Sequence, residues 1–104
     1  MIRILIVSQY LFICNALSSV LESEPDMEVV GSVISVRDAL DMVSKADLVL
    51  VNVNMPNNGA FKLINSINSA KLNAKVIVLG LTETKEQVLQ YLQAGAAGYV
   101  LRDD

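Results

Sequence analysis

Histidine and tryptophan are absent from this sequence, and cysteine occurs once, at Cys14. A single thiol cannot form a disulfide within the chain, and a zinc site of the Cys/His type is excluded without histidine. We interpret Cys14 as a core residue and expect the chain to work in a reducing compartment, the cytoplasm. Its fold must then depend on a hydrophobic core, without cross-links or a structural metal.

Long apolar runs and clusters of basic residues are missing too. Polar or turn residues interrupt every apolar run well before the roughly 18 residues of a membrane-spanning helix. The eight Lys and Arg residues are scattered, and the net charge is −3. The sequence therefore predicts no membrane segment and no direct binding of nucleic acid by this chain.

The sequence does contain many hydrophobic residues, which occur in short runs in a regular order. Hydrophobic residues make up 53% of the chain and charged residues 18%, which suits one domain over residues 1–104. Short runs rich in Val, Ile and Leu alternate with helical patterns, which is typical of a parallel sheet covered on both faces. The expected strands are Ile2–Val7, Glu28–Val33, Leu48–Val53, Val76–Leu81 and Tyr99–Leu101.

Four helices fit between these runs. Ser35 with Asp38 and Thr84 with Gln87 have the spacing of capping boxes, and Gly95 is expected to end the last helix in a left-handed conformation. The residues expected to face the core are Cys14, Leu17 and Leu21 in the first helix, Val36, Ala39, Leu40 and Val43 in the second, Phe61, Ile64 and Ile67 in the third, and Val88, Leu89 and Leu92 in the fourth.

The ends of the predicted strands are where a functional site is expected, because ligands of doubly wound folds bind at the carboxyl ends of strands. The polar or unusual residues there are Ser8, Gln9, Asn52, Asn54, Gly80 and Arg102. The turn after the first strand contains no glycine, which argues against a dinucleotide site or a P-loop. By themselves, Asn52 and Asn54 are typical of strand-end amides that hydrogen-bond to the backbone.

Five segments of the chain resemble the receiver domain of bacterial response regulators, most closely the NarL/FixJ type that precedes a LuxR-like helix-turn-helix. These segments cover residues 2–7, 21–31, 47–56, 76–79 and 94–103. The resemblance extends over the whole chain. It implies an α/β fold of the flavodoxin or CheY type, a doubly wound, five-stranded parallel sheet in the order 2-1-3-4-5, with the fifth helix missing or truncated.

The same resemblance assigns roles to the strand ends. In the family, two acidic residues after the first strand hold Mg²⁺, an Asp ending the third accepts the phosphoryl group, and a Ser or Thr and a Lys contact it. The matching residues here are Ser8, Gln9, Asn52, Gly80 and Arg102. Neutral side chains hold Mg²⁺ poorly, and an amide is not a nucleophile toward phosphorus. The resemblance thus implies a degenerate site with no catalytic residue, metal or cofactor.

Our leading hypothesis is a phosphorylation-independent interaction and dimerisation module that is not an enzyme. We expect it to be part of a transcription regulator whose DNA-binding domain lies outside this chain. The resemblance implies a homodimer through the fourth helix and the fifth strand. We expect Tyr91 and Tyr99 to be its anchors, and Tyr99 also occupies the switch-aromatic position of the family.

Two other hypotheses remain open at this stage. In one, a neutral pocket at Ser8, Asn52, Gly80 and Arg102 senses a small ligand that is anionic or forms hydrogen bonds. In the other, a kinase phosphorylates the hydroxyl of Ser8 or Thr82, although nothing in the sequence activates either group.

Overall fold

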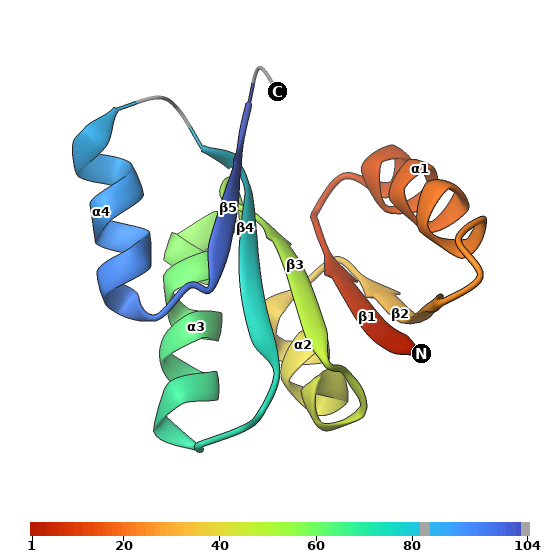
Figure 1. Cartoon of the computed structure of the whole chain (residues 1–104). Helices are drawn as coiled ribbons and strands as arrows, with labels where there is room; N and C mark the ends of the chain where they lie inside the picture. The colour runs from red at the N-terminus through yellow and green to blue at the C-terminus, as the bar shows by residue number, and fades with distance from the viewer. Residues whose placement is uncertain (82–83, 103–104) are drawn as a thin grey trace.

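The computed structural model of the chain, which describes residues 1–81 and 84–102, contains a five-stranded parallel sheet with helices on both faces (Figure 1). The strand order is β2-β1-β3-β4-β5, so the doubly wound α/β fold is confirmed. The elements are β1 (Ile2–Val7), α1 (Leu11–Glu22), β2 (Met27–Val33), α2 (Val36–Met42), η1 (Val43–Lys45), β3 (Leu48–Asn52), η2 (Pro56–Asn58), α3 (Gly59–Ser69), β4 (Lys75–Leu81), α4 (Lys85–Ala94) and β5 (Gly98–Leu101).

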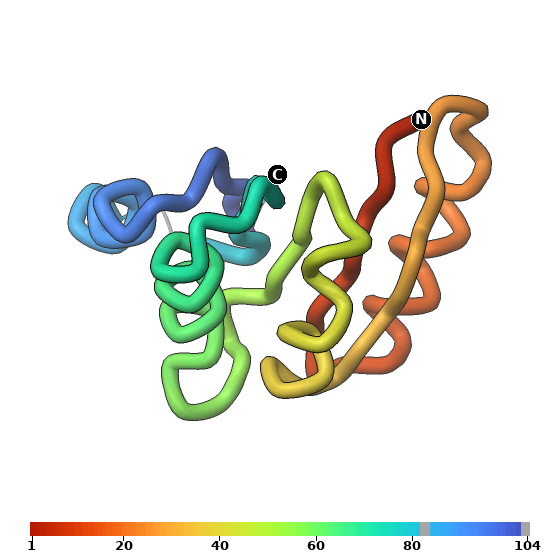
Figure 2. The backbone as a smooth tube through the Cα atoms, turned by 90° about the horizontal axis from the view of Figure 1, so that it is seen from below, coloured from red at the N-terminus to blue at the C-terminus, as the bar shows by residue number. Residues whose placement is uncertain are grey.

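The alternation of side chains along each strand divides the core into two parts. The larger part packs one face of the sheet against α2, α3 and α4, through residues that include Leu5, Val7, Val49, Val51, Val78, Leu63, Ile64 and Ile67. The smaller part packs the other face against α1, through Ile4, Ile6, Leu50, Cys14, Leu17 and Leu21. Figure 2 shows α1 beside β1 and β2, apart from the other helices. No fifth helix follows β5 in the part of the chain that the structure describes.

Helix α4 is turned differently from the prediction. Leu89 and Leu92 are 43% and 39% exposed, so their expected burial is wrong. Tyr91, which was expected to be an outward anchor, is 5% exposed and stacks on Phe61 of α3, with ring centroids 4.1 Å apart. Burial also raises the pKa of the Tyr91 phenol. The stack favours this orientation because it buries two aromatic rings, whereas the predicted orientation buries two leucines.

Helix α2 shows the same kind of difference on a smaller scale. The Ser35 hydroxyl accepts a hydrogen bond of 3.1 Å from the Asp38 N–H, which confirms the predicted helix start. Ala39 and Val43 are buried as expected, but Leu40 is 40% exposed and lies in a groove between α2 and α3. The helix spans only seven residues, of which Ala39 is buried, and the buried Val43 begins η1 directly after it.

Two glycines adopt a positive φ where the chain changes direction. Gly95 ends α4 with φ +114°, as predicted, and the space of a Cβ at this residue is taken by the side chain of Asn68. Gly80 has φ +85° at an irregularity in the pairing of β4 with β5, between Leu79 and Leu81. This extra residue breaks the alternation of the strand, so the fully buried Leu81 joins the larger core, whereas Leu79 packs against the smaller one.

Candidate functional site

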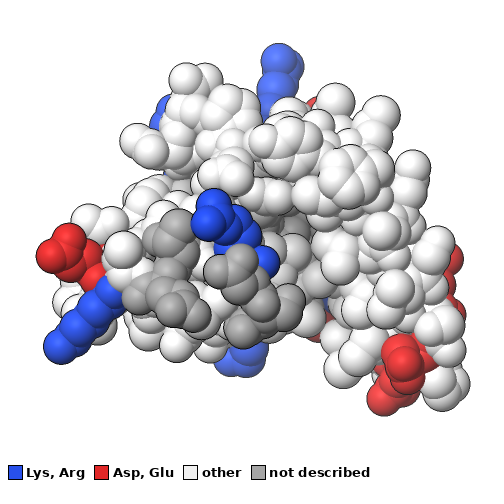
Figure 3. Space-filling view, turned by 90° about the horizontal axis from the view of Figure 1, so that it is seen from above, with Lys and Arg blue, Asp and Glu red and all other residues white. Residues whose placement is uncertain are grey.

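The five residues at the strand ends all lie at one edge of the sheet. Ser8 and Gln9 follow β1, Asn52 ends β3, Gly80 lies in β4 and Arg102 follows β5. Figure 3 looks onto this edge of the sheet. The topology thus places these residues at the carboxyl ends of the strands, where the doubly wound fold predicts a site.

Ser8 is part of the local backbone structure. Its side chain is 1% exposed, and its hydroxyl accepts a hydrogen bond of 3.2 Å from the Tyr10 N–H. The Ser8 carbonyl accepts a 3.5 Å hydrogen bond from the Cys14 thiol in the first turns of α1. These contacts fix the turn between β1 and α1, so Ser8 does not present its hydroxyl to a ligand.

Gln9 and Asn52 connect the turn after β1 to the turn after β3. The Gln9 amide donates a 2.6 Å hydrogen bond to the Asn54 carbonyl, while the Asn52 Oδ1 accepts one of 2.9 Å from the Asn54 N–H. Asn52 is 8% exposed. The Gln9 Oε1 atom is buried and has no hydrogen-bond partner within the described residues. The amide of Asn52 therefore hydrogen-bonds to the backbone at the strand end, as the interpretation without the family resemblance predicted.

Three of the five residues surround a pocket of about 510 Å³. Asn52, Gly80 and Arg102 line it, whereas Ser8 and Gln9 do not. The backbone N–H of Arg102 donates a 2.8 Å hydrogen bond to the Leu81 carbonyl, and its side chain is exposed. The remaining lining residues are Asn54, which the sequence analysis placed at a strand end, Leu17, which it placed in the core, and Tyr10, Ile13, Leu79, Val100 and Leu101, which it did not single out for a site. Ile13 and Leu17 lie one helical turn apart on α1. This spacing of apolar residues is the feature of the sequence that indicates the pocket wall.

No metal site is formed in the described part of the chain. Nowhere in residues 1–81 and 84–102 do three His, Cys, Asp or Glu side chains come together so that they could hold an ion. Over the same residues, no helix is long and apolar enough to cross a membrane.

Known proteins resemble this chain in sequence and in structure. Residues 4–103 match the response regulator receiver domain family. The chain is 35% identical to the transcriptional regulatory protein YxjL of Bacillus subtilis, over 81% of this chain and 39% of that protein. It is 24% identical to the nitrate/nitrite response regulator NarL of Escherichia coli, over 96% of this chain and 47% of that protein.

A solved structure gives the same result at the level of the fold. The signal receiver domain of NarL from Mycobacterium tuberculosis superposes with a TM-score of 0.90 and 23% identity, covering 99% of this chain and 85% of that one. The chain spans less than half the length of the two curated relatives. Because the family match extends over nearly all of its residues, this chain belongs to the response regulator receiver domain family.

Proposed function

We propose that this chain is a receiver domain that works without phosphorylation, as an interaction and dimerisation module. The observation that carries the proposal is the state of Asn52, the residue at the end of β3. Its side chain is an amide, it is 8% exposed, and its oxygen holds the Asn54 N–H. A neutral amide used in this way is no phosphoryl acceptor.

The residues around Asn52 do not fit Mg²⁺, the metal of the family. Mg²⁺ prefers anionic oxygen ligands in an octahedral arrangement and gives up its water reluctantly. Ser8 and Gln9 are both neutral, and the side chains of both are already hydrogen-bonded to neighbouring backbone. These neutral residues therefore do not support metal-dependent phosphoryl transfer at this edge of the sheet.

The contacts that would hold a phosphoryl group are also changed. Gly80 has no hydroxyl, and Arg102 offers a planar guanidinium in place of a compact ammonium. Phosphorylation of Ser8 by a kinase is disfavoured because that side chain is 1% exposed. The other candidate hydroxyl, that of Thr82, lies outside the described residues.

Magnesium chloride with beryllofluoride, a mimic of an acyl phosphate, is expected to leave the protein unchanged. The neutral donors at Ser8, Gln9 and Asn52 cannot hold the complex. Amide chemical shifts around Asn52 and the melting temperature should both stay the same up to millimolar Mg²⁺. A saturable shift at these residues would show that the site still accepts the phosphoryl mimic.

We further propose that the domain regulates transcription from the cytoplasm, together with a DNA-binding domain, and has no enzyme activity of its own. The support is the family and the relatives, since YxjL is a transcriptional regulatory protein and NarL a response regulator. Both are more than twice as long as the matched region.

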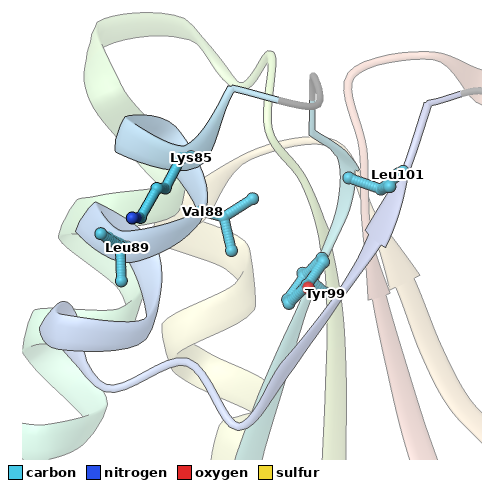
Figure 4. A pocket seen from close by; sticks show the side chains of 5 residues that line it. All are labelled: Lys85, Val88, Leu89, Tyr99 and Leu101. Atoms are coloured by element: carbon cyan, nitrogen blue, oxygen red, sulfur yellow. The ribbon is translucent and has the colours of Figure 1, made fainter.

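The surface that best fits an interface is formed by α4 and β5. Lys85, Val88 and Leu89 of α4 and Tyr99 and Leu101 of β5 line a pocket of about 430 Å³, shown in Figure 4. β5 is the last strand in the order of the sheet, so this surface lies at one side of the molecule. Tyr99 is 43% exposed on this surface. An exposed aromatic beside apolar side chains suits the centre of an interface.

Tyr99→Ala is expected to weaken dimerisation by about 1 to 2 kcal/mol, or roughly fivefold to thirtyfold, because it removes the aromatic anchor. Sedimentation velocity over a concentration series measures the change. Tyr10→Ala is the matched control, since Tyr10 is also 43% exposed but lies at the start of α1. A wild type that stays monomeric at high micromolar concentration would contradict dimerisation.

A further inference from the structure

Helices α2 and α3 pack side by side on the face of the sheet opposite to α1, and a groove runs between their outer surfaces (Figure 2). The groove has a volume of about 650 Å³, and its apolar lining is Val36 and Leu40. Leu40 is 40% exposed. Both helices connect described strands, β2 to β3 and β3 to β4, so the groove is formed within the fold itself.

The apolar strip continues from this groove toward the start of α2. A second hollow of about 250 Å³ shares Val36 and Lys62 with the groove and is also lined by Ile34, which is 51% exposed. Ile34 and Leu40, two of the exposed large apolar residues of the chain, therefore lie along one continuous strip. A contiguous apolar strip with a polar rim is typical of an interaction surface.

The charges beside the strip make this surface complementary to itself. Arg37 in the first turn of α2 and Asp41 in its last turn both line the groove, and neither forms an ion pair within the described residues. Lys62 lies in the first turn of α3, at the same end as Arg37, because both helices run back between parallel strands. Positive charge at one end and negative charge at the other match a second copy turned by 180°.

We propose that this groove receives helix α2 of a second copy of the chain, with the two α2 helices antiparallel about a two-fold axis. Arg37 of each copy then faces Asp41 of the other, and the two Leu40 side chains lie between these ion pairs. Burial of leucine supplies the attraction, whereas exposed ion pairs mainly fix the orientation of the two copies. The other wall, Asn65 and Ser66 of α3, is neutral and small, so a helix can approach closely.

This inference goes beyond the proposed dimerisation through α4 and β5. Helix α3 packs against both α2 and α4, so it separates the two surfaces. A chain with two self-complementary surfaces joins dimers into larger assemblies as its concentration rises. The groove between two short helices is small for an interface, and we expect it to associate with a dissociation constant of about 0.1 to 1 mM.

The variants Arg37→Asp and Asp41→Arg test the pairing in the full chain, with Tyr99→Ala as the parent so that the other interface is weakened. Each variant alone places like charges opposite one another and should weaken association at least about tenfold. An equimolar mixture of the two should associate within about threefold of the parent, because every facing pair then has opposite charges. Sedimentation equilibrium from about 10 μM to 1 mM measures these changes.

A double variant that carries both exchanges in one chain should also associate within about threefold of the parent, because the exchanged charges are again opposite across the axis. Both exchanges suit the helix, since they put a negative charge in its first turn and a positive charge in its last. Thermal unfolding of each variant verifies that the domain stays folded.

Leu40→Asn separates the apolar contact from the charges and should weaken association about fivefold. The matched control is Leu72→Asn. Leu72 is 39% exposed, as Leu40 is nearly to the same extent, but it lies between α3 and β4 and does not line the groove. This control should associate like the parent.

The proposal is overturned if the parent stays monomeric up to about 1 mM, if the single variants associate as strongly as the parent, or if their mixture stays as weak as each alone. In the last case a helix of another protein is the occupant that remains. Wild-type chains that dimerise but do not respond to exchanges at Arg37 and Asp41 would keep the α4–β5 interface and reject the groove. The two proposals therefore fail separately.

Discussion

Tyr91→Ala is expected to lower the free energy of unfolding by about 3 to 4 kcal/mol, as is usual when a buried aromatic side chain is removed from a core. Tyr91 is 5% exposed and stacks on Phe61 with an angle of 10° between the rings, so the truncation leaves a cavity between α3 and α4. Urea unfolding followed by circular dichroism measures the change.

Two other variants make this result specific. Tyr91→Phe keeps the ring and the stack, and should lose less than about 1 kcal/mol. Tyr99→Ala removes a tyrosine that is 43% exposed and should also lose less than about 1 kcal/mol. Equal losses for Tyr91→Ala and Tyr99→Ala would show that α4 does not bury Tyr91. Because Tyr91 is buried and Tyr99 is exposed, Tyr99 is the residue whose substitution tests the interface without unfolding the domain.

The triple variant Ser8→Asp, Gln9→Asp and Asn52→Asp is expected to lose about 3 kcal/mol or more of stability without metal and to regain much of it in Mg²⁺. Ser8 and Asn52 are 1% and 8% exposed, so the new carboxylates would be buried close to one another. A bound Mg²⁺ would neutralise them and stabilise the folded state by mass action. The wild type should gain no stability from Mg²⁺ in the same thermal unfolding series.

Phosphorylation of these variants is expected only where carboxylates are present to hold Mg²⁺. Asn52→Asp alone should stay unlabelled by acetyl phosphate, because Ser8 and Gln9 still give Mg²⁺ no carboxylate. The triple variant should become labelled at residue 52. Asn65→Asp, which adds one exposed carboxylate on α3, controls for the change in net charge of the Asn52→Asp single variant. Labelling of the Asn52→Asp single variant as strong as that of the triple variant would contradict the role given to Ser8 and Gln9.

The triple variant keeps Gly80 because of the backbone conformation of this residue. A threonine would restore the hydroxyl found in the family, but Gly80 has φ +85°, a conformation that a β-branched residue rarely adopts. The space around it is adequate, since a Cβ there would meet Val53 at 3.5 Å. The obstacle to substitution is therefore the positive φ of the backbone at Gly80.

The sequence by itself determined the elements and their order. Runs of Val, Ile and Leu identify all five strands to within about one residue at each end, because parallel strands buried on both faces require continuous apolar segments. Ser35 and Gly95 mark a helix start and a helix end through local hydrogen bonding and backbone conformation, which depend on neighbouring residues alone. The set of residues at the strand ends follows from that order.

The tertiary structure decided which face of each helix is buried and which polar atoms are exposed. Helix α4 has apolar residues on more than one side, and only the position of Phe61 on α3 favours burial of Tyr91 over Leu89 and Leu92. The inward orientation of Ser8 depends on the start of α1. The pocket beside Arg102 depends on how α1 lies against β4 and β5. Contacts between segments distant in the chain leave no periodic signal in the sequence, so the phase of a helix and the lining of a pocket emerge only when the elements pack together.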